Sequence, residues 1–248
     1  MVQPAVVLLR PNTQNEADAA LCRSLGWQPI PFGTHKLVAD AAALNRLPEK
    51  GNDADAVFWV SPGAADIAAG ALLPYSGSLK PIHIAVGEAT ARRLRELGFA
   101  QVICPQDGHD SEAVLRLPLW REKTGKLLIV RGTFGRDVLA ETVRGLGWQV
   151  CVAEVYSRET VRLDWHALEV YQNTGCLKAV YVTAVAQVHE WFCQAPPAFT
   201  PVLKRLLYFT HHPRIAEALA AHQVSRIFVG SLREGLSSTA NKETINHE

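Results

Sequence analysis

The strongest constraint on the fold is a repeated alternation between short apolar runs rich in β-branched residues and longer amphipathic stretches. This alternation predicts α/β architecture with mainly parallel sheets flanked by helices. Continuous apolar character in Val57–Val60 and Leu127–Val130 indicates strands that are covered on both faces. The predicted strands are Ala5–Leu9, Ala56–Val60, Ile82–Val86, Gln101–Cys104, Leu127–Val130, Ala179–Val182, Leu206–Phe209 and Arg226–Val229, and predicted helices include Glu88–Leu97, Asp137–Leu146 and Pro213–Ala221.

An internal repeat indicates that the chain holds two similar lobes. Leu8-Leu9-Arg10 followed by Leu25-Gly26-Trp27-Gln28 matches Ile129-Val130-Arg131 followed by Leu146-Gly147-Trp148-Gln149 at one constant offset. Weaker parallels later in the chain also fit the strand-then-helix pattern that any two α/β units share. Duplication predicts two lobes, and a cleft between lobes is a common place for a small-molecule site.

Charge and cysteine usage argue against several classes of function. The 248 residues carry a formal net charge of +1 with interleaved signs, so no surface for nucleic acid is predicted. The apolar run Ala5–Leu9 is too short for a signal peptide or for a membrane span of about 20 residues. Five widely spaced cysteines without a CxxC pair predict reduced thiols in a cytoplasmic protein, and neither disulfides nor a zinc site.

The common catalytic motifs are missing from the sequence. Gly132-Thr133-Phe134-Gly135 has the wrong spacing for a dinucleotide loop, and neither a Walker A lysine nor a GxSxG elbow is present. In His109-Asp110-Ser111 we expect Ser111 to cap a helix that begins at Glu112. The adjacent His211-His212 pair does not predict a metal site, because neighbouring residues seldom converge on one ion.

Several predicted strands end in small, hydroxylic or basic residues. Ligands of open α/β sheets bind beyond the carboxyl ends of the strands, where helix N-termini favour anions. Singly, each Ser or Thr could equally be a helix cap. Together they indicate a site for a ligand with several acidic groups. The residues are Arg10-Pro11, Ser61-Pro62-Gly63, Gly87-Glu88-Ala89-Thr90, Arg131-Gly132, Thr183-Ala184 and Thr210.

An ordered set of motifs carries a family resemblance over most of the chain. The set comprises Arg10-Pro11, Asp55 to Ala64, Val86 to Ala91 with Gly98, Pro105, Ser111-Glu112, Gly125-Lys126, Ile129 to Gly132, Gly135-Arg136, Leu146-Gly147 and Val155-Tyr156-Ser157-Arg158. In this order and spacing the motifs resemble those of the uroporphyrinogen-III synthase family.

The resemblance implies two α/β lobes joined by a two-stranded antiparallel connector. An outer lobe is expected from residues 1–32 and 159–248, and a middle lobe from residues 37–154. The crossings are then expected near residues 33–36 and 155–158. The family needs no metal or organic cofactor, so none is expected here.

The resemblance also implies a reaction in haem biosynthesis, with the linear tetrapyrrole hydroxymethylbilane as substrate. Loss of its hydroxyl gives an azafulvene, a spiro intermediate forms, and the ring closes with the terminal pyrrole inverted. The implied enzyme is a cofactor-independent lyase, which we expect to be a monomer. The alternative is a non-enzymatic two-lobe binding module for a small anionic ligand.

The resemblance assigns roles to particular residues. Tyr156 is the expected proton donor to the departing hydroxyl, and Ser61, Gly87 and Thr90 are expected to line the site. The expected carboxylate partners are Arg10, Arg131 and Arg158, and each could instead be a surface or lobe-stabilising charge.

The second lobe departs from the family pattern. Ala184 stands where the family has serine, so Thr183 would have to supply the hydroxyl. Thr210-His211-His212-Pro213 replaces a turn of glycine and threonine. In this lobe the residues expected to contact the substrate therefore differ from those of the family.

Overall fold

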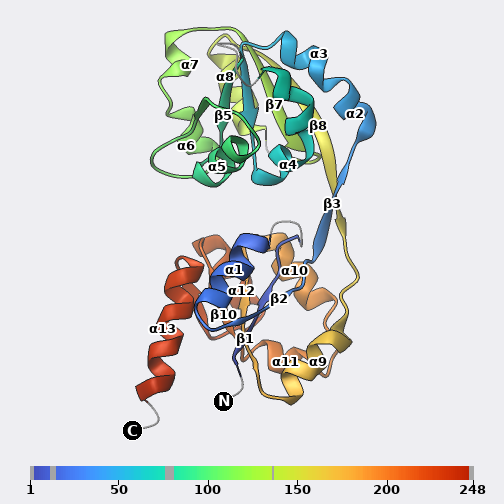
Figure 1. The fold of residues 1–248 in the computed structure, drawn as a ribbon, viewed down its shortest axis with the longest axis vertical. Coiled ribbons are helices and arrows are strands. Elements are labelled where there is room, and N and C mark those ends of the chain that lie inside the picture. Colours follow the sequence, from blue (N-terminus) through green and yellow to red (C-terminus); the bar gives the residue numbers. More distant parts are fainter. Residues whose placement is uncertain (1–2, 12–14, 76–80, 136, 246–248) are drawn as a thin grey trace. The chain divides into compact units, whose positions relative to one another are not determined.

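The computed structural model describes residues 3–11, 15–75, 81–135 and 137–245. The chain forms two compact units (Figure 1). Unit 1 comprises Met1–Lys36 and Glu159–Glu248, and unit 2 comprises Leu37–Arg158. The chain leaves unit 1 in β3 (His35–Ala39) and returns in β8 (Gln149–Thr160).

The core of unit 1 is a parallel sheet with strand order β11-β10-β9-β1-β2. Successive residues along β1 face opposite sides of this sheet. Val6 and Leu8 pack in one cluster with α1 and α13, whereas Val7 and Leu9 pack in another with α9, α10, α11 and α12. The elements are β1 (Ala5–Leu8), α1 (Glu16–Ser24), β2 (Gln28–Pro31), α9 (Trp165–Asn173), β9 (Leu177–Tyr181), α10 (Val185–Cys193), α11 (Thr200–Leu203), β10 (Leu207–Thr210), α12 (Pro213–Ala221), β11 (Ile227–Val229) and α13 (Leu232–Ile245).

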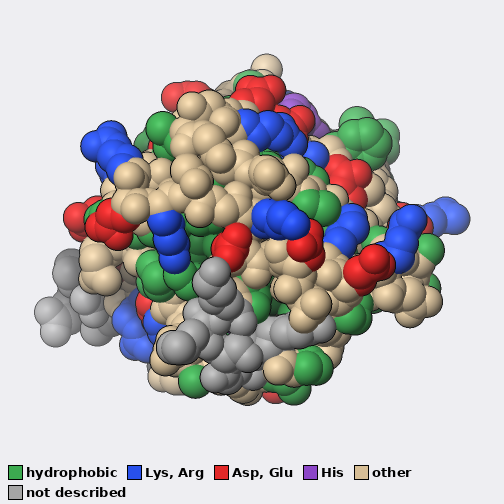
Figure 2. All heavy atoms as spheres, turned by 90° about the horizontal axis from the view of Figure 1, so that it is seen from above, with side chains coloured by type: hydrophobic (Ala, Val, Ile, Leu, Met, Phe, Trp, Pro, Cys, Tyr) green, Lys and Arg blue, Asp and Glu red, His purple; other side chains and the backbone are tan. Residues whose placement is uncertain are grey.

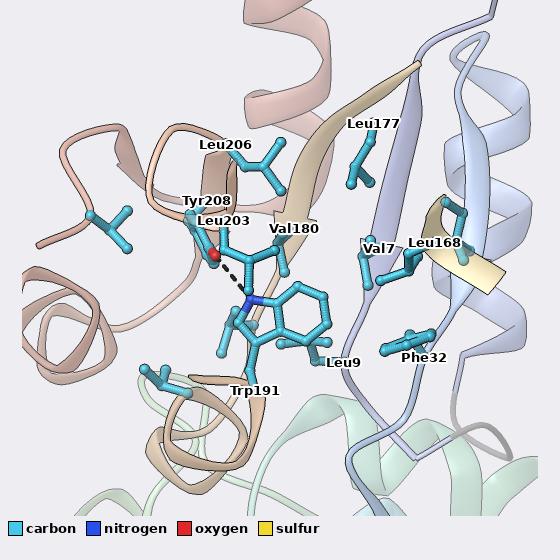
Figure 3. Close-up of a cluster of buried hydrophobic side chains, with 14 of the residues drawn as sticks. Val7, Leu9, Phe32, Leu168, Leu177, Val180, Trp191, Leu203, Leu206 and Tyr208 are labelled. Carbon is cyan, nitrogen blue, oxygen red and sulfur yellow. Dashed lines mark hydrogen bonds between the residues drawn. The ribbon is translucent and has the colours of Figure 1, made fainter. Parts of the chain in front are cut away.

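Trp191 occupies the interior of unit 1, where Val7, Leu9, Phe32 and Tyr208 surround it (Figure 3). Its indole Nε1 donates a hydrogen bond of 2.9 Å to the hydroxyl of Tyr208, and both residues are fully buried. Because a buried polar group without a partner is costly, this bond lets two large aromatic residues share one apolar core.

Unit 2 is built on a second sheet, with strand order β3-β8-β7-β4-β5-β6. Val57 and Trp59 of its central strand pack with α3, α4 and α5, while Ala56 and Phe58 pack with α6, α7 and α8 on the other face. The remaining elements are α2 (Ala41–Asn45), α3 (Leu47–Asn52), β4 (Ala56–Trp59), α4 (Pro62–Leu72), the 3₁₀ turn η2 (Leu73–Tyr75), β5 (Ile82–Ala85), α5 (Glu88–Glu96), β6 (Val102–Ile103), α6 (Ser111–Leu115), α7 (Leu119–Glu122), β7 (Lys126–Gly132) and α8 (Val138–Gly145).

The predicted mixed α/β class with mainly parallel sheets is confirmed. The pairs β4–β5, β4–β7, β5–β6 and β7–β8 in unit 2 are all parallel, as are β1–β2, β1–β9, β9–β10 and β10–β11 in unit 1. β3 and β8 are hydrogen-bonded neighbours. Val161 N donates to Thr34 O and Asp40 N donates to Val155 O, so numbering rises along one strand as it falls along the other. These two hydrogen bonds partly support the expected antiparallel connector.

Both copies of the Leu-Gly-Trp-Gln repeat form the same helix ending. Gly26 follows α1 with φ +79°, and Gly147 follows α8 with φ +91°. In each copy the backbone N–H of the tryptophan donates a hydrogen bond to the carbonyl five residues before it, that of Cys22 or Val143. This arrangement is the Schellman motif, in which glycine adopts the left-handed conformation at low cost. The repeat thus encodes a helix stop followed by a buried tryptophan.

One predicted cap is wrong. α6 begins at Ser111 itself, and its N-cap is Asp110, whose Oδ1 accepts a hydrogen bond of 2.8 Å from Ala113 N. Asp and Ser are both good N-cap residues, so the sequence alone does not show which of two adjacent candidates caps the helix.

Surface properties agree with the charge pattern of the sequence. Figure 2 shows basic and acidic side chains interspersed over the face that it draws. Among the residues that the structure describes, no helix is both long and apolar enough to cross a membrane.

Two buried ionisable groups of unit 1 should lower the free energy of unfolding at alkaline pH. Burial and the nearby Asp18 charge raise the pKa of the Cys22 thiol to about 12, and burial likewise raises the pKa of Tyr181 to about 12. In the unfolded chain these groups ionise near their ordinary values of 9.0 and 10.0, so ionisation favours the unfolded state above about pH 9. We therefore expect the free energy of unfolding to fall from about pH 9 to about pH 12, as urea titrations at several pH values would measure.

Cys22→Ala should reduce this alkaline loss, because it removes one of the groups whose pKa differs between the two states. Cys193→Ala is the matched control, since Cys193 is exposed. Equal alkaline slopes in the wild type and Cys22→Ala would contradict the assignment.

Candidate active site

The strand order of unit 2 brings four predicted site segments to one edge of its sheet. β8, β7, β4 and β5 are consecutive neighbours. Trp59 of β4 is paired with Val130 of β7 and with Ala85 of β5, and Gly132 of β7 is opposite Tyr156 of β8. The residues that follow these strands therefore emerge side by side at the carboxyl edge, where open α/β sheets bind ligands.

Ser61 links β4 to the N-terminus of α4. Its backbone is extended, Pro62 occupies the first helical position, and its Oγ accepts a hydrogen bond of 3.1 Å from Ala64 N. This geometry is that of a helix cap. The same Oγ lies 3.3 Å from the hydroxyl oxygen of Tyr156. Ser61 thus caps the helix and also contacts the phenol.

Tyr156 reaches Ser61 by crossing the neighbouring strand. β7 lies between β8 and β4 in the sheet, and Gly132 is the β7 residue opposite Tyr156. A Cβ added to Gly132 would lie 2.7 Å from Cζ of the Tyr156 ring, too close for any real contact. The ring therefore lies over the glycine, and Gly132 leaves the space that lets the phenol meet Ser61. The Tyr156 side chain is 3% exposed.

The first turn of α5 contributes Gly87 and Thr90. Gly87 is the N-cap, and a Cβ there would lie 2.7 Å from Cβ of His109, so glycine permits a close approach of the loop before α6. Thr90 is buried and its N–H donates to Gly87 O. The N-termini of α4 and α5 both lie at the carboxyl edge, and the two helices pack against each other (Figure 1).

Arg131 is held by protein groups. Its guanidinium donates to Asp137 at 2.7 Å, to Glu154 at 3.1 Å and to the carbonyl of Gly135 at 3.1 Å. Only 8% of the residue is exposed. Two carboxylates already neutralise this cation. Its hydrogen bonds to Gly135 and Asp137 hold the loop after β7.

Three further predicted site residues are Arg158 in unit 2 and Arg10 and Thr183 in unit 1. Arg158 is exposed on β8. In unit 1, Arg10 forms an ion pair of 2.8 Å with Asp18. The Thr183 hydroxyl donates to Gln187 Oε1 at 3.3 Å, and the same oxygen accepts from the Thr183 N–H at 2.8 Å. The side chain of Gln187 in the first turn of α10 thus holds Thr183, which directly precedes the N-cap residue Ala184.

A comparison with known sequences identifies the family. Residues 16–231 match the family described as uroporphyrinogen-III synthase HemD. The chain belongs to the uroporphyrinogen-III synthase family. A uroporphyrinogen-III synthase from Salmonella typhimurium is 32% identical over 179 residues, which cover 65% of this chain and 71% of the relative.

Solved structures share the fold of this uroporphyrinogen-III synthase family member. A mutant uroporphyrinogen III synthase from Thermus thermophilus matches with a TM-score of 0.58 and 20% identity, covering 99% of this chain and 100% of that one. The uroporphyrinogen-III synthetase of Helicobacter pylori matches with a TM-score of 0.59 and 15% identity, covering 96% and 99%. At these identities the likeness concerns the fold alone.

One residue of the cluster in unit 2 was not singled out from the sequence. Gly132 was noted only as a strand end, because its role depends on which side chain crosses it. Arg136, part of the family motif, lies outside the described residues. Within the described ranges, no group of three or more His, Cys, Asp or Glu side chains could hold a metal ion.

Proposed function

We propose that this chain is a lyase that closes hydroxymethylbilane to uroporphyrinogen III, with inversion of the terminal ring through a spiro intermediate. The observation that carries the proposal is the Tyr156–Ser61 hydroxyl pair at the carboxyl edge of a sheet in a chain of this family. A binding module would need no such pair and would leave hydroxymethylbilane to close unaided.

Tyr156 is the proposed proton donor. Its phenol protonates the departing hydroxyl, which leaves as water and creates the azafulvene. The substituted carbon of the terminal ring attacks to form the spiro intermediate. This intermediate fragments and recloses at the unsubstituted α carbon of the same ring. That last carbon loses a proton as its pyrrole regains aromaticity, and this proton restores the phenol. Ser61, at 3.3 Å, orients the hydroxyl in the meantime.

The substrate supplies most of the reactivity, so the protein's main contribution is to hold one conformation and to stabilise developing charge. The N-termini of α4 and α5 and the exposed Arg158 favour the substrate's carboxylates. Gly87 and Thr90 shape the first turn of α5. We propose that Arg131 positions the loop after β7, because Asp137 and Glu154 already form ion pairs with its guanidinium.

Other parts of the proposal rest on the family. We propose that Arg10 and Thr183 face substrate from the outer lobe, and that residues 33–36 and 155–158 act as the crossings between lobes. We also propose a cytoplasmic monomer that needs no cofactor.

The proposed function predicts a specific product. After exhaustive chelation and without added cofactor, purified protein should convert hydroxymethylbilane to the type III isomer. Chromatography of the oxidised porphyrins separates this isomer from type I, which forms by unassisted closure. A product that is type I alone would show that the chain is not this enzyme.

A further inference from the structure

The loop after β7 holds an aromatic side chain in an unusual state. Phe134 is fully exposed and its φ is +60°, the left-handed region that bulky residues avoid. Within the described ranges, Gln223 at φ +65° is the one other residue besides glycine with positive φ. A strained backbone that places a phenyl ring in water is doubly unfavourable for the isolated fold. Such positions cluster at functional sites.

The conformation of Phe134 is imposed by fixed neighbours on both sides. Thr133 N donates a hydrogen bond of 2.8 Å to Tyr156 O, which ties the start of the loop to β8. The carbonyl of Gly135 accepts from Arg131 at 3.1 Å, and Arg131 is itself held by Asp137. The loop thus presents the ring outward, and no residue that the structure describes in unit 2 covers it.

The position of Phe134 connects it to the proposed chemistry. The residue directly before it is hydrogen-bonded to the backbone of Tyr156, whose phenol meets Ser61. A phenyl ring has no charge or hydrogen-bonding group to offer, so it recognises flat, apolar faces. Each ring of a linear tetrapyrrole has two such faces, while its acidic groups lie around its edge.

We propose that Phe134 is a substrate-contacting residue that stacks on one pyrrole ring of the bound linear tetrapyrrole. This inference rests on the proposed function. The stacked ring stays planar through the reaction, so the contact stabilises the bound substrate and the transition state about equally. Loss of the ring should therefore raise KM and leave kcat nearly unchanged. The strained backbone is the cost of a preformed stacking surface.

The test compares three variants with hydroxymethylbilane as the probe. Phe134→Gly removes the ring and relieves the positive φ, so we expect KM to rise by about 3- to 10-fold while kcat changes less than about twofold. Its Tm should rise by about 2–4 °C. Phe134→Ala removes the ring but keeps the strain, so it should show the same KM without the gain in Tm. Gln223→Gly relieves the matching strain in unit 1 and should leave KM unchanged.

The outcomes separate this inference from the proposed function. A wild-type product that is type I alone overturns the function, whatever the variants do. If the wild type makes type III and Phe134→Gly keeps the wild-type KM, the function stands and the stacking role is wrong. A fall in Tm for Phe134→Gly with unchanged KM would instead show that the ring packs against protein in solution, which also overturns the stacking role.

Discussion

Gly132→Ala is expected to lower the rate of type III closure by about 10²-fold. The added Cβ would lie 2.7 Å from Cζ of Tyr156, so the ring has to move. Moving it separates the phenol from Ser61 and from the position where it can protonate the departing hydroxyl. Displacements of about 1 Å at a reacting group cost rates of this order. Steady-state kinetics together with isomer analysis would measure the loss.

Gly145→Ala provides the matched control in the same unit. Nothing lies within 4 Å of a Cβ at Gly145, so this methyl should leave both rate and isomer ratio unchanged. Gly132→Ala is expected to lower the free energy of unfolding by about 1–3 kcal/mol through overpacking, which leaves the protein folded under assay conditions. A wild-type rate in folded Gly132→Ala would show that the position of the Tyr156 ring does not govern the reaction.

The hydrophobic pattern was sufficient to predict the fold class and most strands, and its failures have physical causes. β2 escaped notice because Pro29 and Pro31 interrupt its apolar run. Proline lacks the N–H that a central strand needs, yet an edge strand tolerates it, and β2 is an edge strand of the unit 1 sheet. β8 was not among the strands predicted from the pattern, because its exposed and half-buried residues dilute the apolar signal over Gln149–Thr160. The family resemblance implied only a crossing near residues 155–158.

The part of the candidate site that depends on local sequence patterns could be predicted. Hydroxyls and glycines that follow strands are visible in a sequence, and parallel strands must deliver them to one edge. The register of β7 against β8 is not visible, so the sequence could not show that Tyr156 crosses Gly132. Local sequence patterns also do not show which arginine forms an ion pair within the protein. From the sequence, Arg131 was expected to bind a carboxylate of the substrate, and the structure adds that Asp137 and Glu154 form ion pairs with it.

Tyr156→Phe is expected to slow type III closure by roughly 10- to 100-fold without abolishing it. A positioned acid typically contributes about 10²–10⁴-fold, but the hydroxyl of hydroxymethylbilane departs readily, which places this case at the low end or below. The phenylalanine ring would still fit over Gly132, so the geometry of the edge should survive. The isomer ratio is the sharper measurement, because slower enzymatic closure lets spontaneous type I closure compete.

Ser61→Ala separates a catalytic phenol from a structural one. It removes the oxygen that caps α4 and the partner of the Tyr156 hydroxyl, so it should cost about 1 kcal/mol of stability and a smaller part of the rate than Tyr156→Phe. If Ser61 acts only by orienting the phenol, adding Ser61→Ala to Tyr156→Phe should lower the rate little further, since the hydroxyl it orients is already gone. If Tyr156→Phe instead keeps the wild-type rate and isomer ratio while Ser61→Ala lowers both, Tyr156 is structural and the proton comes from another group.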